Sequence, residues 1–253
     1  MEEPITLKSG LTLPNRLAKA AMAENLSDQD LLPTDQVYTA YKTWARGGWG
    51  LLITGNVQVD PRHLGQAGDI ANNDSIDRSR LLDSWRKWAS VSRNGGTPTV
   101  VQVSHPGRQS PLGAGTGGLF DKALAPSAIP LRLGKGVFAG VISRLLFGTP
   151  RAMTVAEILD VQDRFVKTEV LAADAGFDGI ELHGAHGYLL SQFLSPNTNQ
   201  RTDEYGGTPG ARAKIVVDII KAIRRAVPPS FTVGIKFNSV PCSTHLPVIP
   251  TCR

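Results

Sequence analysis

The sequence predicts an α/β fold built on a parallel sheet, and three observations support this prediction. Short β-rich runs alternate with helical stretches along the 253 residues, which is the pattern of strands joined by crossover helices. Five such strands follow one another, whereas eight βα units close a (β/α)₈ barrel. Three of the five carry polar residues near their carboxyl ends, where barrel enzymes place their chemistry. We therefore expect an incomplete (β/α)₈ TIM barrel with about five of its eight βα units.

The expected elements follow one another regularly after a small hairpin over residues 5–13, which is placed to plug the bottom of a barrel. The expected strands span 17–22, 49–54, 99–103, 179–183 and 231–237, and the expected helices span 35–46, 76–93, 154–176 and 208–227. In the third helix, Thr154 and Glu157 form a capping-box pair and Gly176 provides a left-handed stop. In the fourth helix, Pro209 lies in the first turn.

The segment 104–154 is too long for an ordinary connection between a strand and a helix. Its run Gly113–Gly118 raises the alternative of a phosphate cradle, but it lacks the P-loop lysine and the strand–turn–helix setting. We interpret this segment as a flexible excursion that lies over the mouth of the barrel.

Composition and charge exclude several classes of protein. The net charge of +5 comes from scattered basic residues, so we expect no nucleic-acid partner. The acidic N-terminus does not resemble a secretory signal, and the most apolar run, Val137–Phe147, is short and interrupted by Arg144, so we expect no membrane partner. Cys242 and Cys252 are the only cysteines, too few for a disulfide scaffold or a metal cluster. These features predict a cytoplasmic location.

Alternation along each strand assigns its side chains to one of two faces. The residues expected to pack outward on helices are Ile180, Leu182, Phe231, Val233, Ile235 and Phe237. The residues expected to point into the barrel are Gln102, Glu181, His183, Thr232, Gly234, Lys236 and Asn238. Solvation of the rim explains any one of these polar groups, whereas polar groups from three strands at one mouth indicate a functional site.

The run from His183 to Tyr188 adds a second histidine, His186, directly after the fourth strand. A zinc site is one alternative, but no nearby cysteine or third histidine completes it, so we expect no metal. Two imidazoles can instead donate hydrogen bonds to a carbonyl oxygen and stabilise the negative charge that develops there. Tyr188 is a plausible proton donor for the same reaction.

Several of these segments, taken together, resemble successive motifs of the old yellow enzyme family of FMN-dependent ene-reductases. The segments that carry this resemblance, in order and in spacing, are Asn15-Arg16, Ala21-Met22, 102–108 (QVSHPGR), 183–196 (HGAHGYLLSQFLSP) and 199–207 (NQRTDEYGG). The likeness runs from Ile5 to Ser239, so residues 1–239 are expected to form the partial FMN-binding barrel. Residues 240–253 hold three prolines and both cysteines, and we interpret them as an irregular tail unrelated to the family.

The resemblance implies FMN as the cofactor and NAD(P)H as the reductant. The residues matching positions that line the flavin ring are Ala21, Met22, Ala23, Gly55, Gln102 and Lys236. Of these, Gln102 matches the residue that bonds the pyrimidine edge, Lys236 the cation beside N1 and O2, and Ala23 stands where the family usually has Thr or Cys.

For the substrate, the resemblance implies an α,β-unsaturated carbonyl compound whose activated C=C is reduced. His183 and His186 match the pair that grips the carbonyl, and Tyr188 matches the residue that protonates the α-carbon. Two alternatives stay open: an inactive truncated fragment that does not hold FMN, and a dienoyl-CoA-reductase-like relative whose cluster cysteines would lie beyond this chain. A homo-oligomer is compatible with all three interpretations.

Overall fold

The computed structural model describes residues 2–118, 121–134 and 136–238, and its centre is a five-stranded parallel sheet. The strands lie in the order β3-β4-β5-β8-β9, so each strand pairs with the next one along the chain. Their bounds are β3 (Ala18–Lys19), β4 (Leu51–Gln58), β5 (Thr99–Ser104), β8 (Gly179–Gly184) and β9 (Thr232–Phe237). This topology confirms the predicted incomplete barrel of five βα units. The predicted tail 240–253 lies outside the described residues.

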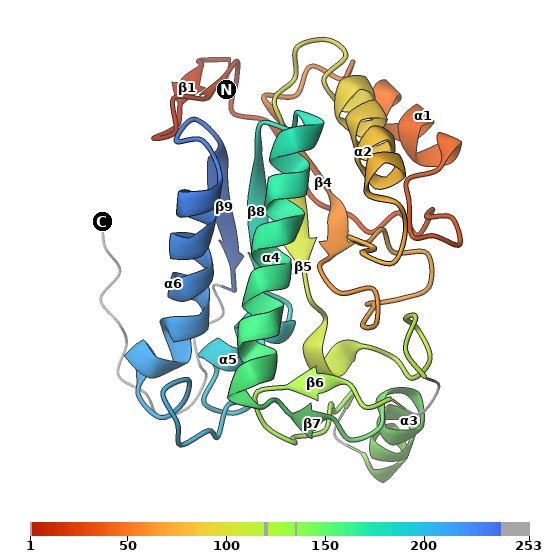
Figure 1. Ribbon diagram of the computed structural model, residues 1–253, viewed down its shortest axis with the longest axis vertical. Helices are drawn as coiled ribbons and strands as arrows, with labels where there is room; N and C mark the ends of the chain where they lie inside the picture. The colour runs from red at the N-terminus through yellow and green to blue at the C-terminus, as the bar shows by residue number, and fades with distance from the viewer. Residues whose placement is uncertain (1, 119–120, 135, 239–253) are drawn as a thin grey trace.

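Four helices lie on one side of this sheet, as Figure 1 shows. They are α1 (Asp35–Trp44), α2 (Arg78–Ser92), α4 (Val155–Ala175) and α6 (Pro209–Ala226). The core between the helices and the sheet contains fully buried aromatic residues, among them Tyr41, Trp85, Trp88 and Phe165. The polar strand residues Gln102, Glu181 and Lys236 do not belong to this core.

Local signals set the ends of these helices largely as predicted. The Thr154 hydroxyl accepts a hydrogen bond from the Glu157 amide, the Glu157 carboxylate reaches back to the Thr154 amide, and Gly176 ends α4 at φ +93°. The second helix begins two residues later than predicted because Asp77 is its N-cap and accepts from two backbone amides in the first turn.

Two strands differ from their predicted bounds. The first strand is only β3, two residues long, instead of 17–22. The second extends to Gln58 instead of ending at Thr54, and its pairing with β5 shifts between Ile53 and Asn56. The prediction missed this bulge, at which the strand passes close to the segment after β3.

The predicted hairpin is present as β1 (Ile5–Thr6) and β2 (Thr12–Leu13), paired antiparallel. The hydroxyl groups of Ser9 and Thr232 lie 2.7 Å apart, which places the hairpin at the amino-terminal end of β9. The opposite end of the sheet, towards which the strand arrows of Figure 1 point, is therefore left open for the functional residues.

The long excursion contains regular elements that the sequence analysis did not predict. It contains a 3₁₀ turn (Gly107–Gln109), β6 (Leu124–Ala125), α3 (Val137–Phe147) and β7 (Arg151–Ala152), with β6 and β7 paired in parallel. A further helix that the prediction missed, α5 (Leu189–Leu194), follows β8. Within the described ranges, no helix is both long and apolar enough to cross a membrane.

The predicted alternation of side chains in the last two strands is largely confirmed. Ile180, Leu182 and Phe231 are buried in the core, while Glu181 and Lys236 are not part of it. Phe237 is the exception, because its side chain is 54% exposed instead of packed on a helix. β9 is an edge of the described sheet, so the end of this strand has little to pack against.

Glu169 on α4 yields a prediction about stability. It is fully buried, neither carboxyl oxygen has a hydrogen-bond partner, and this desolvation raises its pKa well above the usual value. We expect Glu169→Met to raise the free energy of unfolding at neutral pH by about 1–3 kcal/mol, the usual cost of an unsatisfied buried polar group.

The folded chain binds the proton of Glu169 more tightly than the unfolded chain does, so this group costs stability as the pH rises above its unfolded pKa. Urea unfolding of both chains should therefore show a gain from Glu169→Met that grows as the pH rises from about 4. The exposed change Asp163→Asn on the same helix is the control and should alter stability by less than about 0.5 kcal/mol. A stabilising effect of Glu169→Met that is the same at all pH values would contradict the account.

Candidate functional site

His183 lies near the carboxyl end of β8, and its environment keeps the imidazole neutral. The side chain is only 3% exposed, and burial, followed by the charges of His186 and Lys236, lowers its pKa to about 4. Its Nδ1 accepts a hydrogen bond from the Ala185 amide at 3.3 Å. A neutral imidazole that accepts at Nδ1 carries its proton on Nε2, so His183 has a donor to offer a ligand.

The other two residues of the motif lie beside this ring. The ring centroids of His183 and His186 are 5.0 Å apart, and those of His183 and Tyr188 are 4.8 Å apart. His186 has φ +56°, a left-handed conformation that a side-chain-bearing residue adopts at a cost. This turn, together with Gly187 at φ +72°, brings the three side chains of the motif together.

The predicted polar residues of β5, β8 and β9 also meet at this end of the sheet. Gln102 pairs with Glu181 across the two strands, and its Nε2 donates to the Glu181 carboxylate at 2.6 Å. His183 pairs in register with Lys236 of β9. The bond to Glu181 orients the Gln102 amide and leaves its Oε1 as an acceptor and its second N–H as a donor.

The predicted ring-lining residues Ala21, Met22 and Ala23 follow β3 in an irregular segment and approach the bulge of β4 at Gly55. A Cβ at Gly55 would collide with the Met22 carbonyl oxygen and the Glu24 carboxylate, so only glycine fits. Gly55 adjoins Asn56, which pairs with Gln102, and Gly55 and Ala23 line a common small hollow. Met22 is 55% exposed.

A buried cluster that the sequence analysis missed holds this segment in place. The Tyr41 hydroxyl donates to the Glu24 carboxylate at 2.6 Å and accepts from the Gly55 amide at 2.7 Å. The Lys19 ammonium lies 3.8 Å from Glu24 and 4.1 Å from the centre of the Trp44 ring. Burial raises the pKa of Tyr41 and of Glu24 and lowers that of Lys19. The cluster thus fixes the chain on both sides of Gly55.

Two further residues position the histidine–tyrosine turn, and a third acts on Tyr188 by its charge; the sequence analysis assigned them no such role. Asn238 accepts a hydrogen bond from the His186 amide at 2.9 Å, and Gln109 donates to the His186 carbonyl at 2.8 Å. Burial, followed by the charge of nearby Asp69, raises the pKa of Tyr188. Only the inward direction of Asn238 was predictable, because the contacts join loops that are far apart in the sequence.

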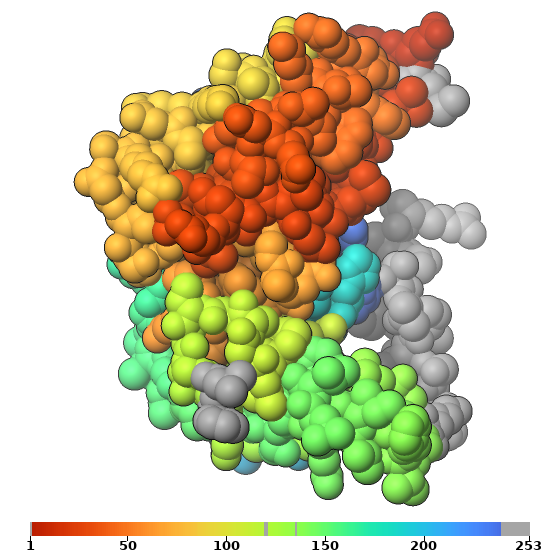
Figure 2. All heavy atoms as spheres, turned by 90° about the vertical axis from the view of Figure 1, so that its right-hand side faces the viewer, coloured from red at the N-terminus to blue at the C-terminus, as the bar shows by residue number. Residues whose placement is uncertain are grey.

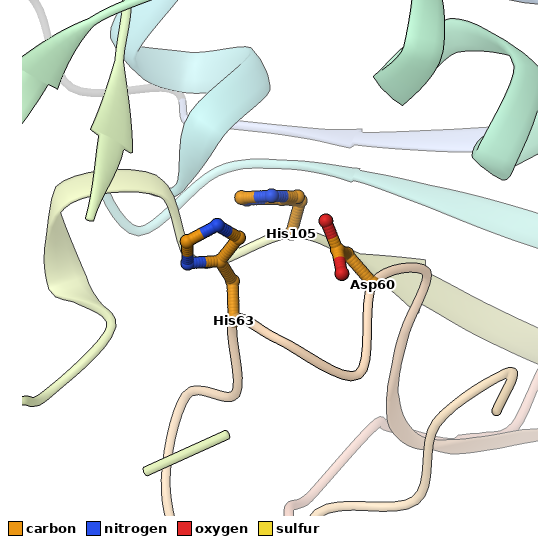
Figure 3. A group of neighbouring side chains, drawn as sticks. All are labelled: Asp60, His63 and His105. Carbon is orange, nitrogen blue, oxygen red and sulfur yellow. The ribbon is translucent and has the colours of Figure 1, made fainter. Parts of the chain in front are cut away.

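A second cluster, Asp60, His63 and His105, has donor atoms within 4.8 Å of one another and faces inward from two loops (Figure 3). Burial lowers the pKa of His63 and lowers that of His105 to about 3, so both rings are neutral. However, both oxygens of Asp60 are bound by Arg62, whose positive charge opposes a cation. In addition, Nδ1 of His105 accepts from the Gly107 amide, which leaves a proton on the unpartnered Nε2. These donors suit a structural role better than metal binding.

Comparison with known proteins places the chain in one family. The profile of the NADH:flavin oxidoreductase / NADH oxidase family matches residues 1–243. The chain is 51% identical over 238 residues to the NADH-dependent flavin oxidoreductase iliE of Neonectria sp. (strain DH2), an alignment covering 94% of this chain and 31% of that protein. It is 50% identical over 240 residues to the NADH-dependent flavin oxidoreductase iccE of Talaromyces variabilis, covering 95% of this chain and 58% of the relative.

A solved structure gives the same result. The chain is similar to the crystal structure of Old Yellow Enzyme from Pichia sp. AKU4542 with a TM-score of 0.77 and 26% identity, covering 92% of this chain and 58% of that chain. The chain therefore spans from under a third to under two thirds of the length of these proteins. Because the family profile covers nearly all of its residues, the chain belongs to the NADH:flavin oxidoreductase / NADH oxidase family.

Proposed function

We propose that this chain contributes the ring-binding and substrate-binding residues of an FMN-dependent oxidoreductase that takes hydride from NAD(P)H and reduces the activated C=C of α,β-unsaturated carbonyl compounds. The observation that carries this proposal is the neutral His183, which offers an Nε2 proton. Its ring lies beside those of His186 and Tyr188, and the residue pairs in register with Lys236. The family membership supports the same chemistry.

The residues present fit the ring of a flavin. Gly55 lets the Met22 carbonyl and the Glu24 carboxylate pass close to β4, which brings Ala23 to the hollow that it shares with Gly55. Gln102 offers an acceptor, which matches an N–H at the pyrimidine edge of the ring. Lys236, in register with His183, would supply the positive charge that favours the reduced ring. When bound, FMN supplies the transfer of hydride from NAD(P)H to the β-carbon of the substrate.

His183 and His186 bind the carbonyl oxygen of the substrate in this proposal. The Nε2 proton of His183 is available because Nδ1 already accepts from the Ala185 amide. A donor that is already oriented in a buried site stabilises the negative charge that develops on the oxygen, because neither protein nor solvent has to reorganise during the reaction. The backbone bonds of His186 to Asn238 and Gln109 hold the second donor in the turn beside it.

Tyr188 supplies the proton to the α-carbon. Because its pKa is raised, the Tyr188 hydroxyl stays protonated and can donate this proton to the α-carbon. The ring lies next to His183, so the hydroxyl and the carbonyl donor can act on neighbouring atoms of one substrate.

We expect Tyr188→Phe to leave flavin reduction and the binding of phenols nearly unchanged and to slow the reduction of simple cyclic enones by about 10²–10⁴-fold, the range of general acid catalysis. Strongly activated alkenes should be less affected, because water can protonate them. The measurement is enone consumption by the chain with NADH and FMN in excess.

Tyr38→Phe is the matched control, because the Tyr38 hydroxyl bonds only the Ser84 carbonyl between two helices away from the site. It should leave the rate unchanged within about twofold. Equal losses on simple and strongly activated alkenes in Tyr188→Phe would show that the tyrosine is structural.

A further inference from the structure

One helix of the excursion exposes an unusual amount of apolar surface. α3 exposes Val137, Phe138, Val141, Leu145 and Leu146 by 89%, 78%, 50%, 71% and 49%. None of these residues belongs to the hydrophobic core that the described residues form. Figure 1 shows α3 at the lower end of the molecule, away from the sheet and its covering helices, and Figure 2 shows the same green segment at the surface.

The side of α3 that faces its own chain holds less exposed residues, among them Ile142 and Phe147. Val137, Val141 and Leu145 are spaced by four residues and therefore share one side of the helix, which faces outward. Ser143 lies on the opposite side, is the buried residue of the helix and accepts a hydrogen bond from the Leu133 amide at 3.0 Å. α3 is therefore apolar on both sides, and a helix of this kind is normally buried. The outward apolar face therefore fits an apolar partner.

The charged residues of the segment that holds α3 are basic. Residues 122–150 contain four Lys or Arg residues and no Asp or Glu, whereas Arg151, directly after them, is bound to Glu157. Arg132, before the helix, and Arg144, within it, are both exposed. In contrast, the outer surface of α4 mixes both signs, with Arg164 bound to Asp160. A second copy of α3 would bring like charges together, whereas an anionic lipid surface would neutralise them.

We propose that α3 docks on an anionic membrane surface, with its apolar face in the lipid interface and Arg132 and Arg144 at the level of the headgroups. At 11 residues the helix is roughly 16 Å long, about half of what spanning a bilayer requires, so it lies on the membrane instead of crossing it. This inference departs from the sequence-based expectation of no membrane partner, which rested on the absence of a spanning segment. It does not depend on the proposed catalytic function.

Cosedimentation of the full chain with lipid vesicles tests the proposal. The chain should bind vesicles of phosphatidylcholine with phosphatidylserine, bind pure phosphatidylcholine much less, and lose binding as salt is added. Phe138→Ser and Leu145→Ser should each weaken binding about tenfold, and Arg144→Ser about fivefold. Leu159→Ser is the matched control, because Leu159 is a 52% exposed leucine on α4, and it should change binding less than twofold.

A second measurement covers variants that fail to fold. Phe138→Trp keeps the apolar face and adds a reporter whose fluorescence brominated lipids should quench. The wild-type chain gives the background, because Trp85 and Trp88 are fully buried but Trp44 and Trp49 are partly exposed. Equal binding to both kinds of vesicle, or an equal loss in Leu159→Ser, would overturn the proposal. So would self-association in the absence of lipid that Phe138→Ser abolishes, because that result identifies a second copy as the occupant.

Discussion

Replacing His183 or His186 with alanine is expected to slow the reduction of enones by about 10²–10³-fold, or about 2.7–4 kcal/mol in the barrier, when FMN is supplied in excess. The reason is the loss of one of two donors to the carbonyl oxygen. For His183 the loss is that of a neutral Nε2 donor, which the bond to the Ala185 amide orients. The affinity for phenolic ligands should fall in the same variants, because a phenolate oxygen uses the same donors.

The reduction of flavin by NAD(P)H provides the internal control for this experiment, because hydride delivery to the flavin needs no polarised carbonyl. That step should slow far less than enone reduction. His186→Asn retains an N–H donor and should keep more activity than His186→Ala. If both alanine variants bind phenols and reduce enones as the wild-type chain does, the histidines do not bind the carbonyl.

The second large effect concerns the chain as a whole: purified alone, it should be colourless and prone to associate. Among the described residues, β3 and β9 are the edges of a sheet that a closed barrel would pair. A few hundred Å² of apolar surface left exposed costs several kcal/mol at roughly 25 cal/mol per Å², comparable with the about 5–15 kcal/mol of a stable domain. The five strands of the described residues do not include the seventh and eighth strands, whose following loops commonly bind phosphate in this fold.

An absorbance spectrum and sedimentation of the purified chain check this expectation directly. A yellow, monomeric protein with one FMN per chain and a cooperative thermal transition would contradict it. That outcome would mean that the residues described here suffice for the whole cofactor, and the interpretation as an inactive fragment would then be wrong.

The sequence predicts the central sheet well because each signal is local. Alternation along β8 and β9 assigns Ile180, Leu182 and Phe231 to the core, and the Thr154–Glu157 box fixes the start of α4. The candidate site is predictable to the same extent, since His183 and Lys236 lie at strand ends that parallel pairing brings into register. Their roles still rest on the resemblance and on the experiments above.

The features that the sequence does not reveal depend on contacts between distant segments. At the bulge, position 55 requires glycine because the Met22 carbonyl passes close by. The hydrogen bond from the His186 amide to Asn238 joins residues 52 positions apart. The excursion was misjudged for a related reason. Its glycine-rich start suggests a flexible loop, whereas β6 and β7 form through a pairing across 27 positions.

Titration of the chain with FMN and with lumiflavin, which has the ring without the phosphate, tests the central claim that these residues form the ring-binding part of a flavin site. The account predicts weak binding of both, with affinities equal within about threefold because only ring contacts are made, and a similar loss of both in Lys236→Met. Binding of neither flavin, or binding of FMN at least 100-fold tighter than lumiflavin (about 2.7 kcal/mol), would contradict it.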